Sequence, residues 1–402
     1  MAFGYDPYIY LAYQQFHLDP AKECKNPDSY QSHDPGHHKR DGFGGTLWRY
    51  IQNTTTYNPE TGSKQTVTPS WAFHKAHLTR WMTDFDINGL RLDSVNNIGN
   101  WDFVRSYKEK AWELFNARYP DADPSERAAK FLVIGEELSM PFDMVSQGYL
   151  NALWNEDWQA RLRAVIIGES AKGDNFEDTV RKMVNCKLAG GFSDGAQAIN
   201  YITSHDVEGY RKERLYNFLQ NNHVVNMEQR AKLAFALFLT AVGVPMIFAG
   251  EEFLDQMDID TPDVADGQAY DKQHDPVNYS RKDEDWRSRI YKYVANLVKF
   301  RKTCPALGVD DTSFIHVDTL KDAKIMAWTR GGVSEGQAPV VVVANFTDYD
   351  TPGSVYEVAN WPDQDRDDWR EVTQNRVVPK AWVGREPLMQ WEAKVYTYGS
   401  VL

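Results

Sequence analysis

The sequence predicts an α/β fold, in which helices cover a parallel sheet, followed by a small antiparallel β domain. Between residues 71 and 307, short apolar runs that suit strands alternate with segments of helical periodicity, which is typical of parallel strands joined by crossover helices. After residue 307 the strand-like runs are separated only by turn residues, which indicates an antiparallel sheet. The 402 residues are 42% hydrophobic and 25% charged, so the chain can bury a sizeable core and does not have a disordered composition.

The predicted elements begin after a loop-rich segment. Residues 1–70 mix Tyr, Asp, Pro, Gly and His without a clear period, so we expect irregular structure there. From Trp71 to Met82 the apolar residues form a helical stripe, and the strand Leu90–Asp93 follows an Asn-Gly turn. Further strands are expected at Phe131–Gly135, Ala152–Trp154, Ala198–Thr203 and Pro245–Ala249, and further helices at Phe103–Phe115, from about Trp158, at Met227–Ala241 and at Trp286–Arg301.

The C-terminal region has a different character. The runs SFIHV, KIMAWT, VVVVAN and AKVYTY have strand composition and no helical pattern between them. We therefore expect three parts: a loop-rich segment at 1–70, an α/β portion at 71–307 and an all-β domain at 308–402.

Charge and cysteine content exclude several classes of partner. Lys and Arg number 44 and Asp and Glu 57, so the net charge is −13 and nucleic acid is not an expected partner. The longest near-apolar run, Ala234–Gly250, is too short and interrupted to cross a bilayer, and the first residues show no signal peptide, so we expect no membrane association. Three widely separated cysteines, Cys24, Cys186 and Cys304, indicate reduced thiols and a cytoplasmic location.

Three acidic residues follow predicted parallel strands. Asp93 ends the first of these strands, Glu136 directly follows the second, and Asp206 follows the sequence YITSH. In a β/α barrel the carboxyl ends of the strands gather at one face, so these side chains are expected to converge. Paired carboxylates there indicate glycoside chemistry, with one as nucleophile and the other as general acid and base. The alternative is that each acid merely caps the following helix.

Basic neighbours favour the catalytic interpretation. Arg91 lies two residues before Asp93, so both side chains point to the same face of the strand, and a guanidinium there would hold the carboxylate ionised and oriented. His205 directly precedes Asp206 and is placed to hydrogen-bond a sugar hydroxyl. We expect both to bind substrate.

Five motifs, in order, resemble those of the α-amylase family of glycoside hydrolases. GLRLDSVNN resembles its G-F-R-x-D pattern, VIGEEL resembles the strand that carries its acid/base, and TSHD resembles its N-H-D motif. VPMIFAGEE is similar to its eighth-strand signature, and LVKFRKTCPAL to the helix that closes its barrel. The resemblance covers residues 70–307 and implies a (β/α)8 TIM-type barrel, with the family's β-sandwich after it.

The resemblance also implies roles for individual residues. Asp93 would be the nucleophile and Glu136 the acid/base, preferred over Glu137 because the family's acid directly follows a small residue, here Gly135. Asp206 would be the third carboxylate, which binds sugar hydroxyls. The implied reaction is retaining hydrolysis of an α-glucan such as starch or maltooligosaccharides, through a covalent glycosyl-enzyme intermediate.

Two departures from the family pattern matter. Where many α-amylases have Lys-His after the nucleophile, this chain has Asn96 and Asn97, so we expect Asn97 at a modified sugar subsite. The family's first motif, D-x-x-x-N-H, is absent from residues 1–88, and the strands found correspond to the fourth through eighth. We therefore expect an incomplete barrel, in a truncated or naturally short form, and a homodimer that covers its open edges.

Other candidate residues carry weaker signals. His33, Asp34, His37 and His38 form a cluster interrupted by Pro and Gly, which favours a solvated loop over a metal site. Calcium is common in the family, but no complete set of oxygen ligands is found, so no cofactor is expected. Glu251 and Glu252 follow the last strand and either line the site or cap a helix, and capping is favoured.

Two rival functions stay open. A transglycosidase or branching enzyme shares these motifs and differs in how it binds the acceptor and excludes water. A catalytically weak carbohydrate-binding protein would suit the missing front motif, but the intact Asp93, Glu136 and Asp206 speak against it.

Overall fold

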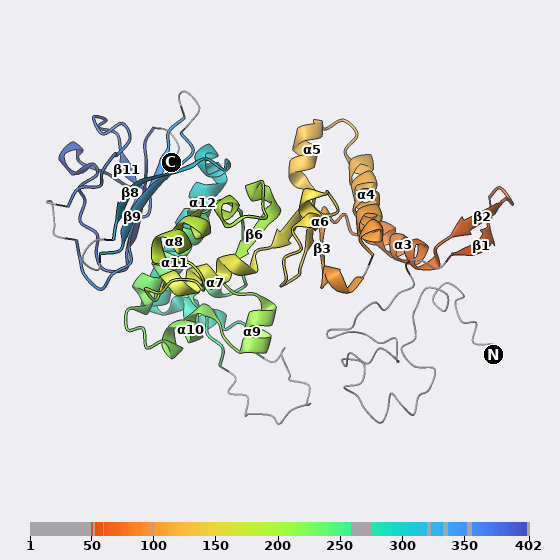
Figure 1. Cartoon of the computed structure of the whole chain (residues 1–402), viewed down its shortest axis with the longest axis horizontal. Coiled ribbons are helices and arrows are strands. Elements are labelled where there is room, and N and C mark those ends of the chain that lie inside the picture. Colours follow the sequence, from red (N-terminus) through yellow and green to blue (C-terminus); the bar gives the residue numbers. More distant parts are fainter. Residues whose placement is uncertain are drawn as a thin grey trace. The chain divides into compact units, whose positions relative to one another are not determined.

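The chain forms two compact units. The computed structural model describes residues 50, 53–58, 60–98, 100–258, 275–319, 323–332, 337–351 and 356–399. One unit comprises Met1–Trp154 and the other Asn155–Leu402. Each is described by itself below, and Figure 1 gives the element labels. The predicted domain boundaries at residues 70 and 307 stay a prediction.

The first unit contains a hairpin that the sequence analysis missed. Strands β1 (Thr54–Tyr57) and β2 (Lys64–Val67) pair antiparallel, so the expectation of irregular structure throughout residues 1–70 is wrong for this part. The connecting turn is held by the side chain of Asn58, which accepts a hydrogen bond of 2.8 Å from the backbone N–H of Glu60. Threonines and a tyrosine favour strands, but they carry no apolar alternation to reveal the hairpin.

The first unit also contains three parallel strands in the order β3-β4-β5. β3 pairs with β4 from Gly89↔Leu132 to Leu92↔Gly135, and β4 pairs with β5 at Gly135↔Leu153. Their bounds and those of the helices between them are α3 (Pro69–Asp84), β3 (Gly89–Leu92), α4 (Trp101–Arg118), α5 (Pro124–Lys130), β4 (Leu132–Gly135), α6 (Asp143–Ser146) and β5 (Ala152–Trp154). The predicted alternation of strands and helices is confirmed here.

Local sequence explains where these helices begin. Pro69 occupies the first turn of α3, where a missing N–H costs no hydrogen bond. The side chain of Asn100 caps α4 by accepting from the N–H of Phe103 at 2.8 Å. α3 and α4 then pack through aromatic side chains, with the rings of Trp71 and Phe103 5.7 Å apart.

The second unit is built around one apolar helix. α11 (Met227–Thr240) is buried along almost its whole length, and α12 (Asp285–Thr303) buries its apolar stripe in the same core. The other helices and the parallel strand pair of this unit are α7 (Glu156–Val165), α8 (Phe176–Val184), β6 (Ala198–Tyr201), α9 (His205–Arg211), α10 (Leu215–Asn221) and β7 (Val244–Met246).

The second unit ends in the predicted antiparallel sheet, in the order β12-β11-β13-β10-β9-β8. Alternate residues of its central strands face two different cores. Trp328 and Val342 pack with α11 and α12, whereas Ala327 and Val343 join Trp361 in a second core on the opposite face. The strands are β8 (Thr312–Asp318), β9 (Ile325–Arg330), β10 (Val340–Asn345), β11 (Arg370–Glu371), β12 (Arg376–Val377) and β13 (Ala393–Thr397).

Within the described residues, no helix combines the length and the apolar character that a bilayer span requires.

Candidate active site

Two of the predicted catalytic residues lie side by side in the first unit. Asp93 and Glu136 directly follow β3 and β4, whose last residues, Leu92 and Gly135, are register partners. The ladder continues one step further, because the N–H of Glu136 donates to the carbonyl of Leu92 at 2.9 Å. Parallel pairing therefore brings two acids 43 positions apart in sequence to one edge of the sheet.

Arg91 joins the two carboxylates. Its Nη1 lies 2.7 Å from Oδ1 of Asp93, and its Nη2 contacts Oε2 of Glu136. The side chain of Asp93 is 75% exposed, whereas that of Glu136 is 7% exposed, so one carboxylate is accessible and the other is withdrawn. A guanidinium between two carboxylates offsets their mutual repulsion. The Arg91 guanidinium also lies over an aromatic ring, because its Cζ is 5.0 Å from the ring centre of Trp154. The ion pair with Asp93 is the one that the spacing of two residues predicts.

Two residues beside the carboxylates, Gly135 and Ser94, are constrained by steric contacts or by backbone conformation. A Cβ atom at Gly135 would lie 2.5 Å from Cδ1 of Leu150, so any larger residue directly before Glu136 requires that side chain to shift. Ser94, directly after Asp93, has a φ of 41°, a left-handed conformation that is unusual for serine. Such strain persists only where the surroundings impose it.

The neighbouring acid, Glu137, has a different task. Its Oε2 accepts from the N–H of Asn96 at 3.2 Å, and its Oε1 accepts from the hydroxyl of Ser139 at 3.2 Å. Glu137 thus holds the loop after β3, which supports the choice of Glu136 as the acid of the pair. The side chain of Asn97 is outside the described part of the structure, so its place at a sugar subsite stays a prediction.

The remaining predicted residues begin α9 in the second unit. β6 ends at Tyr201, and Ser204 caps α9 by accepting from the N–H of Val207 at 3.3 Å. Nε2 of His205 lies 3.6 Å from Oδ2 of Asp206, and their side chains are 56% and 42% exposed. An acid in the first turn also stabilises a helix, so the capping interpretation of Asp206 is compatible with its position.

The sequence analysis did not predict a network of buried charged residues that includes Glu208 of α9, Arg214 and Glu251. Arg214, 1% exposed, donates from Nε to Oε1 of Glu208 at 2.5 Å and from Nη1 to the carbonyl of Ala249 at 2.8 Å. Glu251 is also buried, and its Oε1 accepts from the N–H of Leu215, the first residue of α10, at 3.3 Å. Glu251 therefore caps a helix, the interpretation that the sequence favoured, but its complete burial had no signal in the sequence.

Burial dominates the ionisation of Glu251. Desolvation raises the pKa of its carboxyl to about 7. The two nearby arginines cannot fully compensate, because each already has an acid of its own: Arg214 pairs with Glu208, and Arg163 contacts Glu213. Because Glu251 accepts from the N–H of Leu215, a pKa near neutrality makes the start of α10 sensitive to pH.

The other sequence candidates add little to the site. The cluster of His33, Asp34, His37 and His38 lies outside the described residues, as does Cys24. Cys186 and Cys304 are free thiols, and both are buried.

The chain is similar in sequence to several known proteins. No protein-family model matches the chain. Malto-oligosyltrehalose trehalohydrolase of Rhizobium sp. (strain M-11) is 24% identical over 347 residues, which cover 70% of this chain and 54% of that protein. Pullulanase of Bacillus subtilis (strain 168) is 23% identical over 258 residues, covering 60% of this chain and 34% of that protein. The chain thus spans about half, or less, of the length of these relatives.

Solved structures agree with the sequence matches. AmyP in complex with maltose superposes with a TM-score of 0.61 at 14% identity, covering 85% of this chain and 71% of that one. The α-amylase from Geobacillus thermoleovorans, complexed with acarbose, superposes with a TM-score of 0.57 at 16% identity, covering 82% and 64%. The predicted fold, part of a β/α barrel followed by an antiparallel β domain, is confirmed by these matches. By sequence and by fold, the chain resembles the glycoside hydrolases of the α-amylase family.

Proposed function

We propose that the chain is a retaining glycoside hydrolase that acts on α-glucans. The observation that carries this proposal is the single guanidinium of Arg91 in contact with both Asp93 and Glu136. Two carboxylates that share one guanidinium are near neighbours, and retaining enzymes need their pair about 5 Å apart, closer than inverting enzymes do. The similarity to a trehalohydrolase and a pullulanase supports this proposal, because both names are those of hydrolases.

The exposure of the two carboxylates supports the roles we propose for them. Asp93 is the accessible carboxylate and attacks the anomeric carbon, while the withdrawn Glu136 gives its proton to the leaving oxygen. The bond from the anomeric carbon to that oxygen breaks as the bond to Asp93 forms. Glu136 then takes a proton from water, which attacks the same carbon and releases Asp93. Arg91, whose Nη1 lies 2.7 Å from Oδ1 of Asp93, orients that carboxylate for the first step.

The other assignments rest on the motif resemblance. We propose that Asp206 and His205 bind sugar hydroxyls, and that Asn97 contacts the sugar on the leaving-group side.

Product analysis tests the function. The purified chain is incubated with soluble starch, maltooligosaccharides and pullulan, beside an Asp93→Asn variant. We expect short reducing sugars from the wild type and none from the variant. Variant activity within tenfold of the wild type, about 1.4 kcal/mol, would rule out Asp93 as nucleophile. Longer products instead of short ones would identify a transglycosidase, and no turnover by the folded wild type would favour a binding protein.

We also propose a cytoplasmic homodimer. The free thiols Cys186 and Cys304 suit a reducing compartment. Among the described residues β3 pairs only with β4, and Trp81 and Phe85 of the adjacent segment are 53% and 54% exposed, so a second copy would cover both an edge and an apolar surface. Light scattering after size exclusion checks this, and a monodisperse monomer would contradict it.

A further inference from the structure

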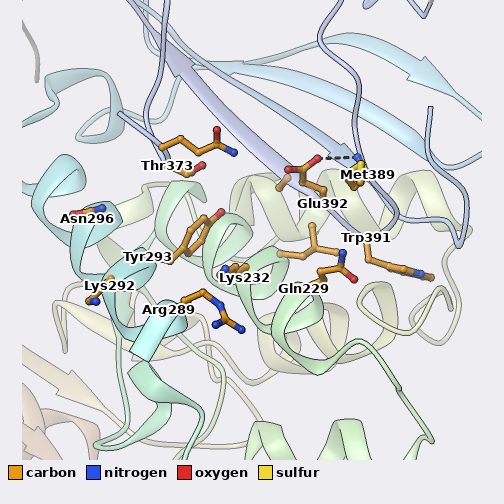
Figure 2. Close-up of a pocket in the computed structure, with 13 residues that line it drawn as sticks. Gln229, Lys232, Arg289, Lys292, Tyr293, Asn296, Thr373, Met389, Trp391 and Glu392 are labelled. Atoms are coloured by element: carbon orange, nitrogen blue, oxygen red, sulfur yellow. Dashed lines mark hydrogen bonds between the residues drawn. The ribbon is translucent and has the colours of Figure 1, made fainter. Parts of the chain in front are cut away.

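Two adjoining hollows lie on α11 and α12 of the second unit, and none of the residues assigned to the reaction lines them. The first, of about 370 Å³, lies between these helices and the C-terminal β domain (Figure 2). The second, of about 640 Å³, lies at the start of α11. Both are lined by Gln229 and Lys232, so they meet along one face of α11.

The first hollow offers neutral hydrogen-bonding groups. Tyr293, Asn296 and Gln229 line it, and in the described part of the chain none of their side chains has a hydrogen-bond partner. Burial, together with the acids Glu371 and Glu392, raises the pKa of Tyr293, so its hydroxyl remains a donor. A phenol and two amides are groups that pair with the hydroxyls of a neutral polyol.

Apart from Lys292, for which the described residues provide no ion pair, the charged groups of the hollows are matched to carboxylates or amines. Oε1 and Oε2 of Glu228 lie 2.7 Å from Nζ of Lys232 and 2.6 Å from Nη2 of Arg289. Glu392 accepts from the N–H of Met389 at 2.8 Å and lies 3.9 Å from Nζ of Lys394. Cations already engaged with a carboxylate attract an anionic ligand less than free ones would, which leaves the neutral groups to select the ligand.

The second hollow adds two aromatic side chains, over whose rings the guanidinium of Arg287 lies on one side. Tyr216 and Trp286 line it, both half-buried, with ring centres 6.4 Å apart. Aromatic faces of this kind suit the apolar face of a sugar ring. The joined hollows therefore run from an aromatic pair, past Gln229, to the polar cluster around Tyr293, which suits several linked sugar units better than one small molecule.

We propose that these hollows bind a segment of an α-glucan chain at a site that takes no part in bond cleavage. The choice of an α-glucan among polyhydroxylated ligands rests on the proposed function. Such a site would hold a long substrate on the protein and raise its local concentration.

Retention in native gels that contain soluble starch tests this site, with maltoheptaose titrations to give affinities. The double variant Gln229→Ala/Asn296→Ala removes two amides that hold no other part of the described protein, so it should fold normally. We expect its affinity to be about tenfold lower, because each lost hydrogen bond costs a few-fold. Trp286→Ala should also weaken binding. Lys302→Ala, exposed on α12 and lining neither hollow, is the matched control and should bind as the wild type does.

The possible results separate this inference from the proposed function. Equal retention of the double variant and the control, or no retention of the wild type, would overturn the site. Stabilisation by inorganic phosphate that exceeds stabilisation by maltoheptaose would overturn it in favour of an anion site. Retention needs no turnover, so starch binding that depends on Gln229 and Asn296 without any released sugar would support the site and count against the hydrolase.

Discussion

Glu251→Gln should stabilise the protein at neutral and alkaline pH but not in acid. The substitution keeps the side-chain volume and an oxygen that can accept from the N–H of Leu215. Because burial raises the pKa of Glu251 from its ordinary 4.5 to about 7, the folded state binds an extra proton between these values. The free energy of unfolding therefore decreases as the pH rises through this window.

The size of the effect follows from the two pKa values. A difference from 4.5 to about 7 corresponds to about 3 kcal/mol at 1.36 kcal/mol per pH unit. Below pH 4.5 the carboxyl is protonated in both states and the penalty is absent, whereas above pH 7 the whole penalty is present. We expect the variant to match the wild type at pH 4.5 and to exceed it by up to about 3 kcal/mol at pH 8.

Urea unfolding, followed by tryptophan fluorescence at pH 4.5, 6 and 8, measures this difference. Glu252→Gln is the control, since it removes the adjacent acid and leaves the buried one in place. A gap that stays constant between pH 4.5 and 8, or a less stable variant at pH 8, would refute the reasoning. A constant gap would mean that Arg214 and Arg163 offset the cost of burial, and a less stable variant at pH 8 would mean that they stabilise an ionised Glu251 by more than burial costs.

Three further predictions concern the carboxylate pair. Arg91→Met removes a cation from the withdrawn Glu136 and should lower the free energy of unfolding by about 2–4 kcal/mol in urea titrations; a loss below about 0.5 kcal/mol would show that other contacts or solvent already compensate the charge. Gly135→Ala places a Cβ atom 2.5 Å from Leu150 and should cost about 1–3 kcal/mol, visible as a lower Tm, while an unchanged Tm would show that Leu150 moves freely. Glu136→Gln should slow starch cleavage more than cleavage of activated aryl glycosides, because a good leaving group needs less protonation; equal losses would point to another acid.

Much of the fold could be predicted because it is encoded in local periodicity. The apolar helical stripe from Trp71 to Met82 lies in α3, and the run VVVVAN forms β10, as the sequence predicts. Both patterns could be recognised because the helix and strand repeats follow from backbone geometry alone. The hairpin at Thr54–Val67 was missed because its threonines give no apolar alternation. It is held instead by its turn and its strand pairing.

The sequence by itself determined that Arg91 and Asp93 share a face, and that acids follow successive parallel strands. Both facts depend only on strand geometry, and the structure adds the contact of Arg91 with Glu136. The burial of Glu251, its neighbours, and the hollow between α11, α12 and the C-terminal sheet were decided by tertiary structure alone. A charged residue has the same local pattern whether it is exposed or enclosed, and its pKa depends on which distant segments exclude water from it.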